Sequence, residues 1–216
     1  MGKKGARTRE SILERAVAIA SRDGLEGLTI GGLAKELDLS KSGLIAHFGT
    51  KEALDLAVLQ TAAALFGHLV IVPAQRVAAG EVRLRALFDG WFRYASSKQL
   101  PGGDIFLSAA TELDDKPGVC RYYVARVHKD WIAALENATR EAIVAKQFRE
   151  NLDVGQIAFT VVGILQGYNT YHRLLNLTNA EARARASFES LLLRARADGV
   201  EPPAGAPAAA IAAAKA

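Results

Sequence analysis

The stretch from Leu33 to Leu54, which reads LAKELDLSKSGLIAHFGTKEAL, constrains the fold more than any other part of the chain. Two helical patterns of about two turns each are separated only by Asp38-Leu39-Ser40. Helices this short are marginal alone, so the pair must be held by packing. A helix-turn-helix needs a tight turn with an apolar anchor, and Leu39 stands where that anchor belongs. Leu44 and Phe48 supply an apolar inner face for the second helix, so the stretch predicts a helix-turn-helix.

The outer side of the second helix is small and polar, with Lys41, Ser42 and Gly43 at its start. Such residues allow a helix N-terminus to approach the base edges of DNA. Thr50 is expected to cap the following helix. The free N–H groups and partial positive charge at the start of that helix suit a phosphate, and Lys51 adds a formal charge there. The arrangement predicts a DNA-binding module.

The net charge of +4 is concentrated at the N-terminus, where Lys3, Lys4, Arg7 and Arg9 occur without an acidic residue among them. The rest of the chain has 23 basic and 23 acidic residues. A basic arm on a neutral body is a candidate for contact with the DNA backbone or minor groove. A disordered arm that only aids solubility is the alternative, and the composition leaves both open.

The rest of the chain is helical in pattern, with no strand alternation and no internal repeat. Apolar spacing and stop signals predict helices over 9–22, 30–37, 41–47, 51–69, 82–97, 105–113, 117–146, 153–175 and 178–197. Expected N-caps are Thr29, Ser40, Thr50 and Asp153, and Thr178 with Glu181 forms an expected capping box. Pro73 is expected to end one helix, and Pro117 to occupy the first position of another. The fold class is therefore all-α, with about nine helices.

Several classes of protein are excluded. A single cysteine, Cys120, makes neither an internal disulfide nor a multi-thiolate site, which suits a reducing cytoplasm. No set of side chains has metal-ligand spacing, so no metal and no cofactor are expected. No apolar run reaches the ~18 residues of a membrane-spanning helix. The charged N-terminus has no apolar stretch behind it, so secretion is not expected and a cytoplasmic location is.

At this point the run LTIGGLAKELDLSKSGLIAHFGTKEALDLAV, Leu28 to Val58, resembles the TetR family of transcriptional regulators. The resemblance implies a homodimer that binds palindromic operator DNA, usually as a repressor, and that is released by a small-molecule effector. Asp38 stands where glycine is frequent, and an aspartate tolerates the left-handed conformation of the turn. Gly31-Gly32 weakens its helix by ~1 kcal/mol per glycine, so that helix depends on packing. Residues assigned to DNA contact are Arg7, Arg9, Thr29, Ser40, Lys41, Ser42, Gly43, His47 and Lys51.

The resemblance also divides the chain. Residues 1–50 form the arm and the three-helix DNA-binding domain, and residues 51–199 form a connecting helix and a C-terminal bundle for ligand binding and dimerisation. The Pro/Ala-rich residues 200–216 are predicted to be disordered. Candidate effector-pocket residues are Trp91, Tyr94, Asp104, Phe106, Trp131, Tyr168, Tyr171 and His172. Candidate dimer-interface residues on the last two long helices are Gly163, Gly167, Phe188, Leu191 and Leu192.

Two other classes of function are compared with a dimeric regulator. An all-helical enzyme acting on a hydrophobic small molecule would need Asp104 to meet His128 or His172 in space. The sequence shows no nucleophile–base pair and no glycine-rich phosphate loop, so we expect no enzyme. A helical scaffold protein would leave the arrangement from Ser40 to Lys51 unexplained. The regulator is the leading hypothesis, with the enzyme as the alternative.

Overall fold

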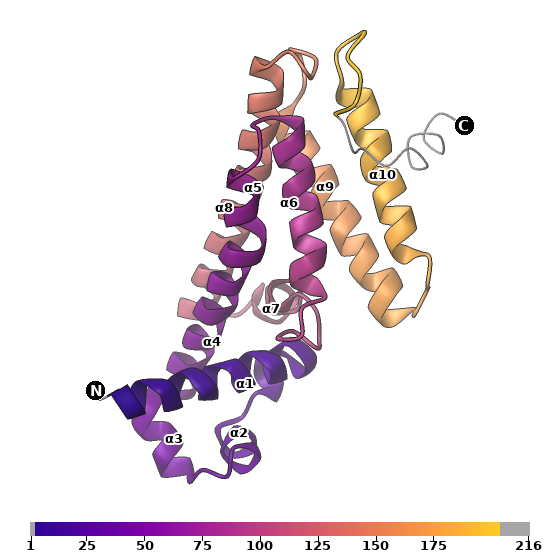
Figure 1. Cartoon of the computed structure of the whole chain (residues 1–216). Helices are drawn as coiled ribbons and strands as arrows, with labels where there is room; N and C mark the ends of the chain where they lie inside the picture. The colour runs from indigo at the N-terminus through magenta and orange to yellow at the C-terminus, as the bar shows by residue number, and fades with distance from the viewer. Residues whose placement is uncertain (1–2, 204–216) are drawn as a thin grey trace. The chain divides into compact units, whose positions relative to one another are not determined.

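The computed structural model describes residues 3–203, with side chains from Thr8 onward, and its elements in that range are helices joined by loops (Figure 1). An isolated antiparallel bridge between Phe148 and Arg196 is the one β-type pairing among these residues. The all-α prediction is confirmed. The elements are α1 (Lys3–Gly27), α2 (Ile30–Glu36), α3 (Lys41–Phe48), α4 (Lys51–Phe66), η1 (Gly67–Ile71), α5 (Val72–Gln75), α6 (Glu81–Ala95), α7 (Ile105–Leu113), α8 (Val119–Val144), α9 (Val154–Asn169), η2 (Thr170–Leu174) and α10 (Ala180–Ala195).

The observed boundaries agree with the predicted ones for α7 and differ by a few residues elsewhere. Pro73 does not end its helix, because the π-helical segment η1 precedes it and helical structure continues to Gln75. The lost N–H of a proline is tolerated where the local bonding has already shifted register. The capping box at Thr178 is wrong, since α10 begins at Ala180 and its N-cap, Asn179, makes no side-chain bond. Pro117 precedes the first residue of α8 by two positions.

The chain divides into two compact units, each made of two segments. The first contains residues 1–72 and 90–129, and the second contains residues 73–89 and 130–216. Helices α6 and α8 contribute residues to both. Residues on both sides of the predicted boundary at residue 50 lie in the first unit, where α1 packs against both α4 and α7.

In the first unit, α1 supplies the central apolar face. Ile12, Ala16 and Ala20 are almost completely buried, as the helical spacing of the sequence predicts. At the C-terminal part of α1, the loop before α7 approaches the backbone so closely that only a glycine fits. The N–H of Gly102 donates to Ser21 Oγ at 3.1 Å, and a Cβ on Gly102 would collide with the Ser21 carbonyl. This approach fixes where α7 begins.

The second unit contains a buried network of four charged side chains from α6, α10 and the residue after α10. Arg196 donates to both oxygens of Glu81, with Nε to Oε2 at 3.0 Å, and Arg85 Nε donates to Glu81 Oε1 at 2.9 Å. Arg85 also pairs with both oxygens of Glu189. The two positive and two negative charges balance, and the Glu81 side chain is only 3% exposed. The stacked rings of Phe88 and Phe188 join the same two helices.

One helical run in the described part of the chain, Lys51–Gln75, is long and apolar enough to cross a membrane by length and composition alone. A core helix of a soluble protein passes the same test. Leu54, Val58, Leu59 and Ala62 of this run are fully buried, and α4 packs against α1 within the first unit. Of the apolar window as a whole, 28% is buried.

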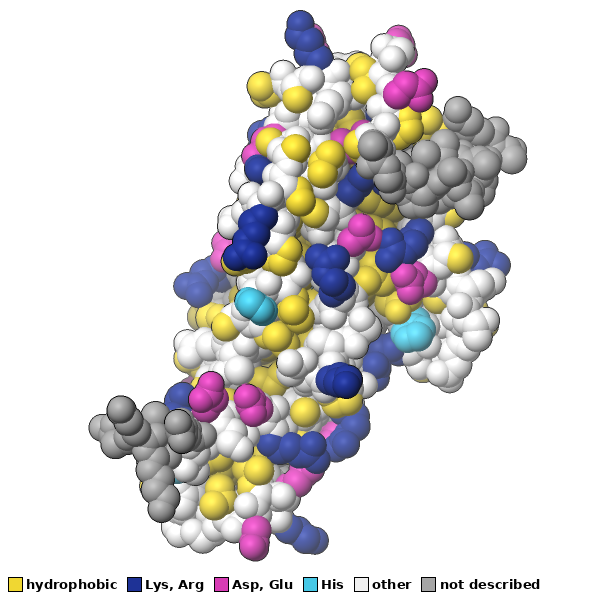
Figure 2. All heavy atoms as spheres, viewed as in Figure 1, with side chains coloured by type: hydrophobic (Ala, Val, Ile, Leu, Met, Phe, Trp, Pro, Cys, Tyr) yellow, Lys and Arg dark blue, Asp and Glu magenta, His cyan; other side chains and the backbone are white. Residues whose placement is uncertain are grey.

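Charged side chains of both signs are interspersed on the face of the molecule drawn in Figure 2, with hydrophobic side chains between them. This agrees with the balanced charge of the body inferred from the sequence.

Glu81→Ala is expected to destabilise the protein by about 3–5 kcal/mol, because it leaves the buried Arg196 guanidinium without its carboxylate and removes one of the two carboxylates that pair with Arg85. The measurement is chemical denaturation followed by circular dichroism. Glu136→Ala is the control, since Glu136 pairs with Arg140 in an (i, i+4) arrangement that is partly exposed to solvent. That change is expected to alter stability by less than about 0.5 kcal/mol. Equal effects of the two changes would contradict a structural role for the buried network.

Candidate nucleic-acid interface and effector pocket

Three short polar side chains begin the helices around the turn, as predicted. Thr29 Oγ1 accepts from the N–H of Gly32 at 3.0 Å at the start of α2. Ser40 Oγ accepts from the N–H of Gly43 at 3.0 Å at the start of α3. Thr50 Oγ1 accepts from the N–H of Ala53 at 3.1 Å at the start of α4. Each cap satisfies one otherwise unpaired donor, so the sequence determines locally where these short helices begin.

The turn between α2 and α3 has the predicted geometry. Asp38 has a φ of 53°, the left-handed conformation that its short polar side chain tolerates. Leu33 and Leu44 are buried on the inner side of the two helices, and Leu39 is half-buried. Lys41 and Ser42 lie on the exposed outer side of α3. Helix α3 therefore packs against the domain through its inner face, and the outer face of its N-terminal part is exposed to solvent.

Gly31 has a packing reason for its place inside α2. A Cβ at this position would lie 3.2 Å from Lys41 Cε and 3.6 Å from Lys41 Nζ. The absent side chain leaves room for the Lys41 stem to lie against α2. The helix tolerates the glycine because the neighbouring helix fills the space, as the predicted dependence on packing requires.

Lys51 is already bonded within the protein. Its ammonium donates to the Leu25 carbonyl at 2.9 Å and forms an ion pair with Asp55 one turn along α4. Burial raises the pKa of the Asp55 carboxyl, and the bond from Lys51 opposes that shift. A role for Lys51 at a DNA phosphate would require these bonds to be exchanged.

Other predicted DNA contacts also have neighbours within the first unit. The Arg9 guanidinium lies over the Phe48 ring, 4.9 Å from its centroid, which is a cation–π contact between α1 and α3. His47 is half-buried beside the same ring. The side chain of Arg7 lies outside the described residues. Arg9 therefore joins the arm end of α1 to the end of the exposed helix.

A polar cluster lies inside the first unit. Helix α6 and the start of α7 contribute four residues that were predicted for the pocket, and α8 contributes His128. Asp104 caps α7 by accepting from the Phe106 N–H at 2.9 Å, and its other oxygen accepts from the Trp91 indole at 2.9 Å. His128 Nε2 lies 3.2 Å from the Phe106 carbonyl oxygen. Burial raises the pKa of the Asp104 carboxyl, while the bonds from Phe106 and Trp91 lower it.

The Tyr94 hydroxyl is the unusual group of this cluster. It is buried and has no hydrogen-bond partner among the described residues, although Tyr and Trp polar atoms usually find one when buried. Burial raises the pKa of Tyr94 well above its ordinary value, and the nearby Asp104 charge adds to the shift. A buried donor without a partner is costly, and ligand sites are where such groups are retained.

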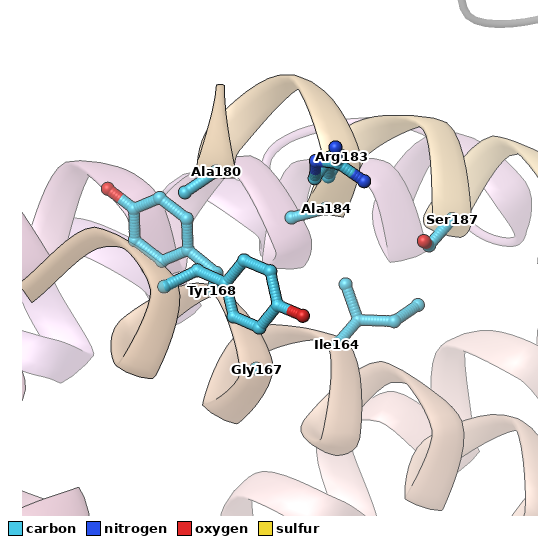
Figure 3. Close-up of a pocket in the computed structure, with 8 residues that line it drawn as sticks. Ile164, Gly167, Tyr168, Ala180, Arg183, Ala184 and Ser187 are labelled. Carbon is cyan, nitrogen blue, oxygen red and sulfur yellow. The ribbon is translucent and has the colours of Figure 1, made fainter. Parts of the chain in front are cut away.

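The remaining pocket candidates belong to the second unit. Tyr168 and Tyr171 line an open cleft of ≈ 270 Å³, and Figure 3 shows Ile164, Gly167 and Tyr168 on one wall with Arg183, Ala184 and Ser187 on the other. His172 stacks on Tyr168 with ring centroids 5.1 Å apart, so the two residues, four apart in sequence, lie on one helical face. Trp131, on α8, is buried. The eight pocket candidates therefore fall into one group in each unit.

The predicted dimer-interface residues divide into exposed and buried ones. Gly163 and Gly167 are exposed on α9, with open space where a Cβ would lie. Phe188, Leu191 and Leu192 are buried within the protomer, and Phe188 stacks on Phe88. The assignment of these three to a surface that meets a second copy is corrected, because their side chains fill the protomer's own core. Phe159 on α9 and Leu174 on η2 are each 74% exposed, and Tyr171 on η2 is 43% exposed.

Sequence reasoning missed the role of Glu112. Its carboxylate accepts from the N–H of Leu25 at 2.9 Å and from the N–H of Glu26 at 3.2 Å, 87 and 86 residues away. No local sequence pattern predicts a contact between residues so far apart in the chain. In the part of the chain that the structure describes, no group of three or more His, Cys, Asp or Glu side chains is placed to hold a metal ion.

The structure contains a helix-turn-helix whose second helix exposes its outer face to solvent, and further helices follow it. These features define the chain as a DNA-binding protein of the helix-turn-helix class. Residues 12–58 match the family model described as bacterial regulatory proteins, tetR family. Residues 80–188 match the model described as tetracyclin repressor-like, C-terminal domain. The chain belongs to the TetR family of transcriptional regulators, whose members are transcription factors and not enzymes. No curated protein matches it significantly.

Solved structures share the fold over nearly the whole chain. A TetR transcriptional regulator from Chloroflexus aurantiacus is 25% identical, with a TM-score of 0.79, covering 89% of this chain and 96% of its own. AibR in complex with isovaleryl coenzyme A and operator DNA is 22% identical, with a TM-score of 0.70, covering 85% and 97%. A regulator from Saccharomonospora viridis in complex with choline is 18% identical, with a TM-score of 0.76, covering 89% and 99%.

Lys51→Ala is expected to lower the free energy of unfolding by about 1–2 kcal/mol, because it removes charge-assisted bonds to Leu25 and Asp55. Thermal and urea denaturation measure the change. Lys41→Ala is the matched control, since Lys41 is exposed and packs only by its stem. We expect it to change stability by less than about 0.5 kcal/mol. A Lys51→Ala variant as stable as the Lys41→Ala variant would show that the Lys51 bonds do not hold the fold.

Proposed function

We propose that this chain is a cytoplasmic, homodimeric, ligand-responsive repressor that binds palindromic operator DNA. The observation that carries the proposal is the bare outer face of α3, with Lys41 and Ser42 exposed at its N-terminus while Leu44 is buried behind them. A recognition helix needs this division, because its inner face must be held rigidly and its outer face must reach base edges in the major groove.

Specific and positioning contacts come from different parts of this surface. Lys41, Ser42 and Gly43 face the bases. Phosphate contacts are assigned to Thr29, Ser40 and His47, and to Lys51 once its bonds to Leu25 and Asp55 are exchanged. Further phosphate or minor-groove contacts are assigned to Arg7 and Arg9. The complex of AibR with operator DNA supports this use of the shared fold.

The effector is proposed to bind inside the helices beside Trp91, Tyr94, Asp104 and Phe106. The support is the buried Tyr94 hydroxyl, which has no hydrogen-bond partner among the described residues and lies within electrostatic range of the buried Asp104 carboxyl. A ligand with a hydrogen-bond acceptor would satisfy that hydroxyl. Relatives crystallised with isovaleryl coenzyme A or choline support a small-molecule site in this fold. An enzyme is not supported, because the chain belongs to a family whose members are transcription factors.

Dimerisation is proposed to use the exposed face of α9 and α10. Phe159, Gly163 and Gly167 lie four residues apart on one face of α9, and all three are exposed. The cleft of Figure 3 lies beside the same face. An exposed phenylalanine next to bare glycines suits close packing against a second copy, and a two-fold dimer matches a palindromic site.

Lys41→Ala is expected to weaken operator binding by about 1–3 kcal/mol if the lysine reads a base. The measurement is fluorescence anisotropy with labelled duplexes from the gene's own upstream intergenic DNA, and with a random-sequence selection if that DNA does not bind. The affinity of the unaltered protein is expected to fall steeply with salt as phosphate contacts release counterions.

The control for this experiment is Lys98→Ala, an exposed lysine in the loop after α6. It is expected to leave both the affinity and its salt dependence unchanged. Binding that is indifferent to DNA sequence, or a Lys41→Ala variant that binds as tightly as the Lys98→Ala variant, would contradict the proposed interface.

Phe159→Asp is expected to shift the protein from dimer to monomer at micromolar concentration, because it places two charges in an apolar interface. Sedimentation velocity measures the change. Val144→Asp is the matched control in the same unit, since Val144 is 84% exposed on α8. It is expected to remain dimeric. A Phe159→Asp variant that stays dimeric would contradict the assignment of the dimer interface to this face of α9.

A further inference from the structure

We propose that Glu112 is the residue through which the interior of the first unit sets the position of the helix-turn-helix. The inference rests on the proposed function, since it concerns how operator binding and the effector site are coupled. Glu112 touches neither DNA nor effector in this proposal, so it is a positioning residue. Every contact that carries the argument lies within the first unit.

The first observation is a break in α1 immediately before the DNA-binding helices. Gly24 has a φ of 78° and a ψ of 173°, which interrupts the helix three residues before its end. The N–H groups of Leu25 and Glu26 after such a break lack the usual carbonyl partners one turn earlier. Glu112 accepts from both of them, at 2.9 and 3.2 Å to the same oxygen. Its other oxygen also accepts from Leu25, at 3.2 Å.

The glycine at the break is required for this contact as well as for the backbone conformation. A Cβ on Gly24 would collide with the Glu112 carboxylate. The Leu25 peptide is also held from its other side, because its carbonyl accepts from Lys51 Nζ at 2.9 Å. Leu25 of α1 is therefore hydrogen-bonded to α7 through its N–H and to α4 through its carbonyl. Thr29, the N-cap of α2, follows only four residues later.

The second observation is that α7 is anchored at its other end in the polar interior. Asp104 caps α7 and accepts from the Trp91 indole, and the unpaired Tyr94 hydroxyl lies in its electrostatic range. Helix α7 has nine residues, so it spans roughly 13 Å as a short rigid rod. A ligand that recruits Asp104 would move the start of α7, and Glu112 near the other end of α7 would move Leu25 with it.

Other charges near Glu112 do not provide the same link. Lys116 pairs with Glu26, but both side chains are more than half exposed. Lys51 and Asp55 pair along α4. Among the described carboxylates, Glu112 alone accepts backbone N–H groups of α1 from another helix. The coupling therefore goes directly from α7 to the turn that precedes α2.

Thermodynamic reciprocity supplies a test that needs no known effector, because DNA binding must perturb the interior if the interior controls DNA binding. The full chain with Trp131→Phe keeps Trp91 as its only tryptophan. The probe is the operator duplex found by anisotropy, added to saturation. We expect the Trp91 emission to change on binding. In the added Glu112→Ala variant that change should be lost, and the Kd for the duplex should rise by at least about fivefold, the lower end of usual coupling.

Two further variants separate positioning from simple loss of stability. Glu112→Gln keeps one oxygen where both N–H groups meet, so it should recover at least half of the Trp91 change. Glu26→Ala breaks the exposed pair with Lys116 in the same region and should leave the Trp91 change and the Kd unaltered. Because the emission is read on DNA-saturated folded protein, reduced stability alone does not remove it.

The outcomes are distinguishable. Loss of the Trp91 change in Glu112→Ala, with recovery in Glu112→Gln, establishes the link. An unchanged signal in Glu112→Ala, or no signal in the Trp131→Phe parent while DNA binds, overturns the link and leaves the proposed function standing. If the parent binds no DNA at all, even after selection from random sequence, both proposals fail together.

Discussion

The first unit depends on how the broken end of α1 is satisfied. Gly24 ends the regular helix, yet Leu25 just beyond it is buried, so its N–H and carbonyl groups are partly withdrawn from water. Buried backbone donors and acceptors need partners, and here they come from α7 and α4. Each partner is a single side chain, Glu112 on α7 and Lys51 on α4. Their bonds to Leu25 therefore fix where α1, α4 and α7 approach one another. The helix-turn-helix begins four residues after Leu25, at Thr29.

The helix-turn-helix was predictable because its determinants are local. Thr29, Ser40 and Thr50 each bond to an N–H three residues ahead, so residue type and spacing are enough to place the helix starts. Asp38 adopts the left-handed turn that its position requires. The same reasoning failed at Thr178, where a local capping pattern exists but the chain bends first at Asn176 and α10 starts later.

The sites that sequence reasoning missed depend on long-range contacts. Glu81, Arg85 and Glu189 appear as ordinary surface charges in a helical pattern, and only the fold reveals that they are buried together with Arg196. Phe188 and Leu192 carry an apolar pattern that suits either a core or an interface, and periodicity cannot distinguish the two. Lys51 has a place that suits a phosphate, but the fold supplies two internal partners for it. Charge and polarity alone do not say which partner a side chain will find.

The interior cluster retains two features that a core selected only for stability would lack. An ionisable carboxyl is buried at Asp104, and the Tyr94 hydroxyl is buried without a partner. Each lowers the stability of the folded state, since buried polar groups lose hydration that their contacts do not fully replace. Sequences that are otherwise locally consistent break such rules chiefly at functional sites. The helix caps, the apolar face of α1 and the balanced ion network of the second unit all follow the local rules for a stable fold. The exception at Tyr94 and Asp104 is therefore the strongest reason to place the effector there.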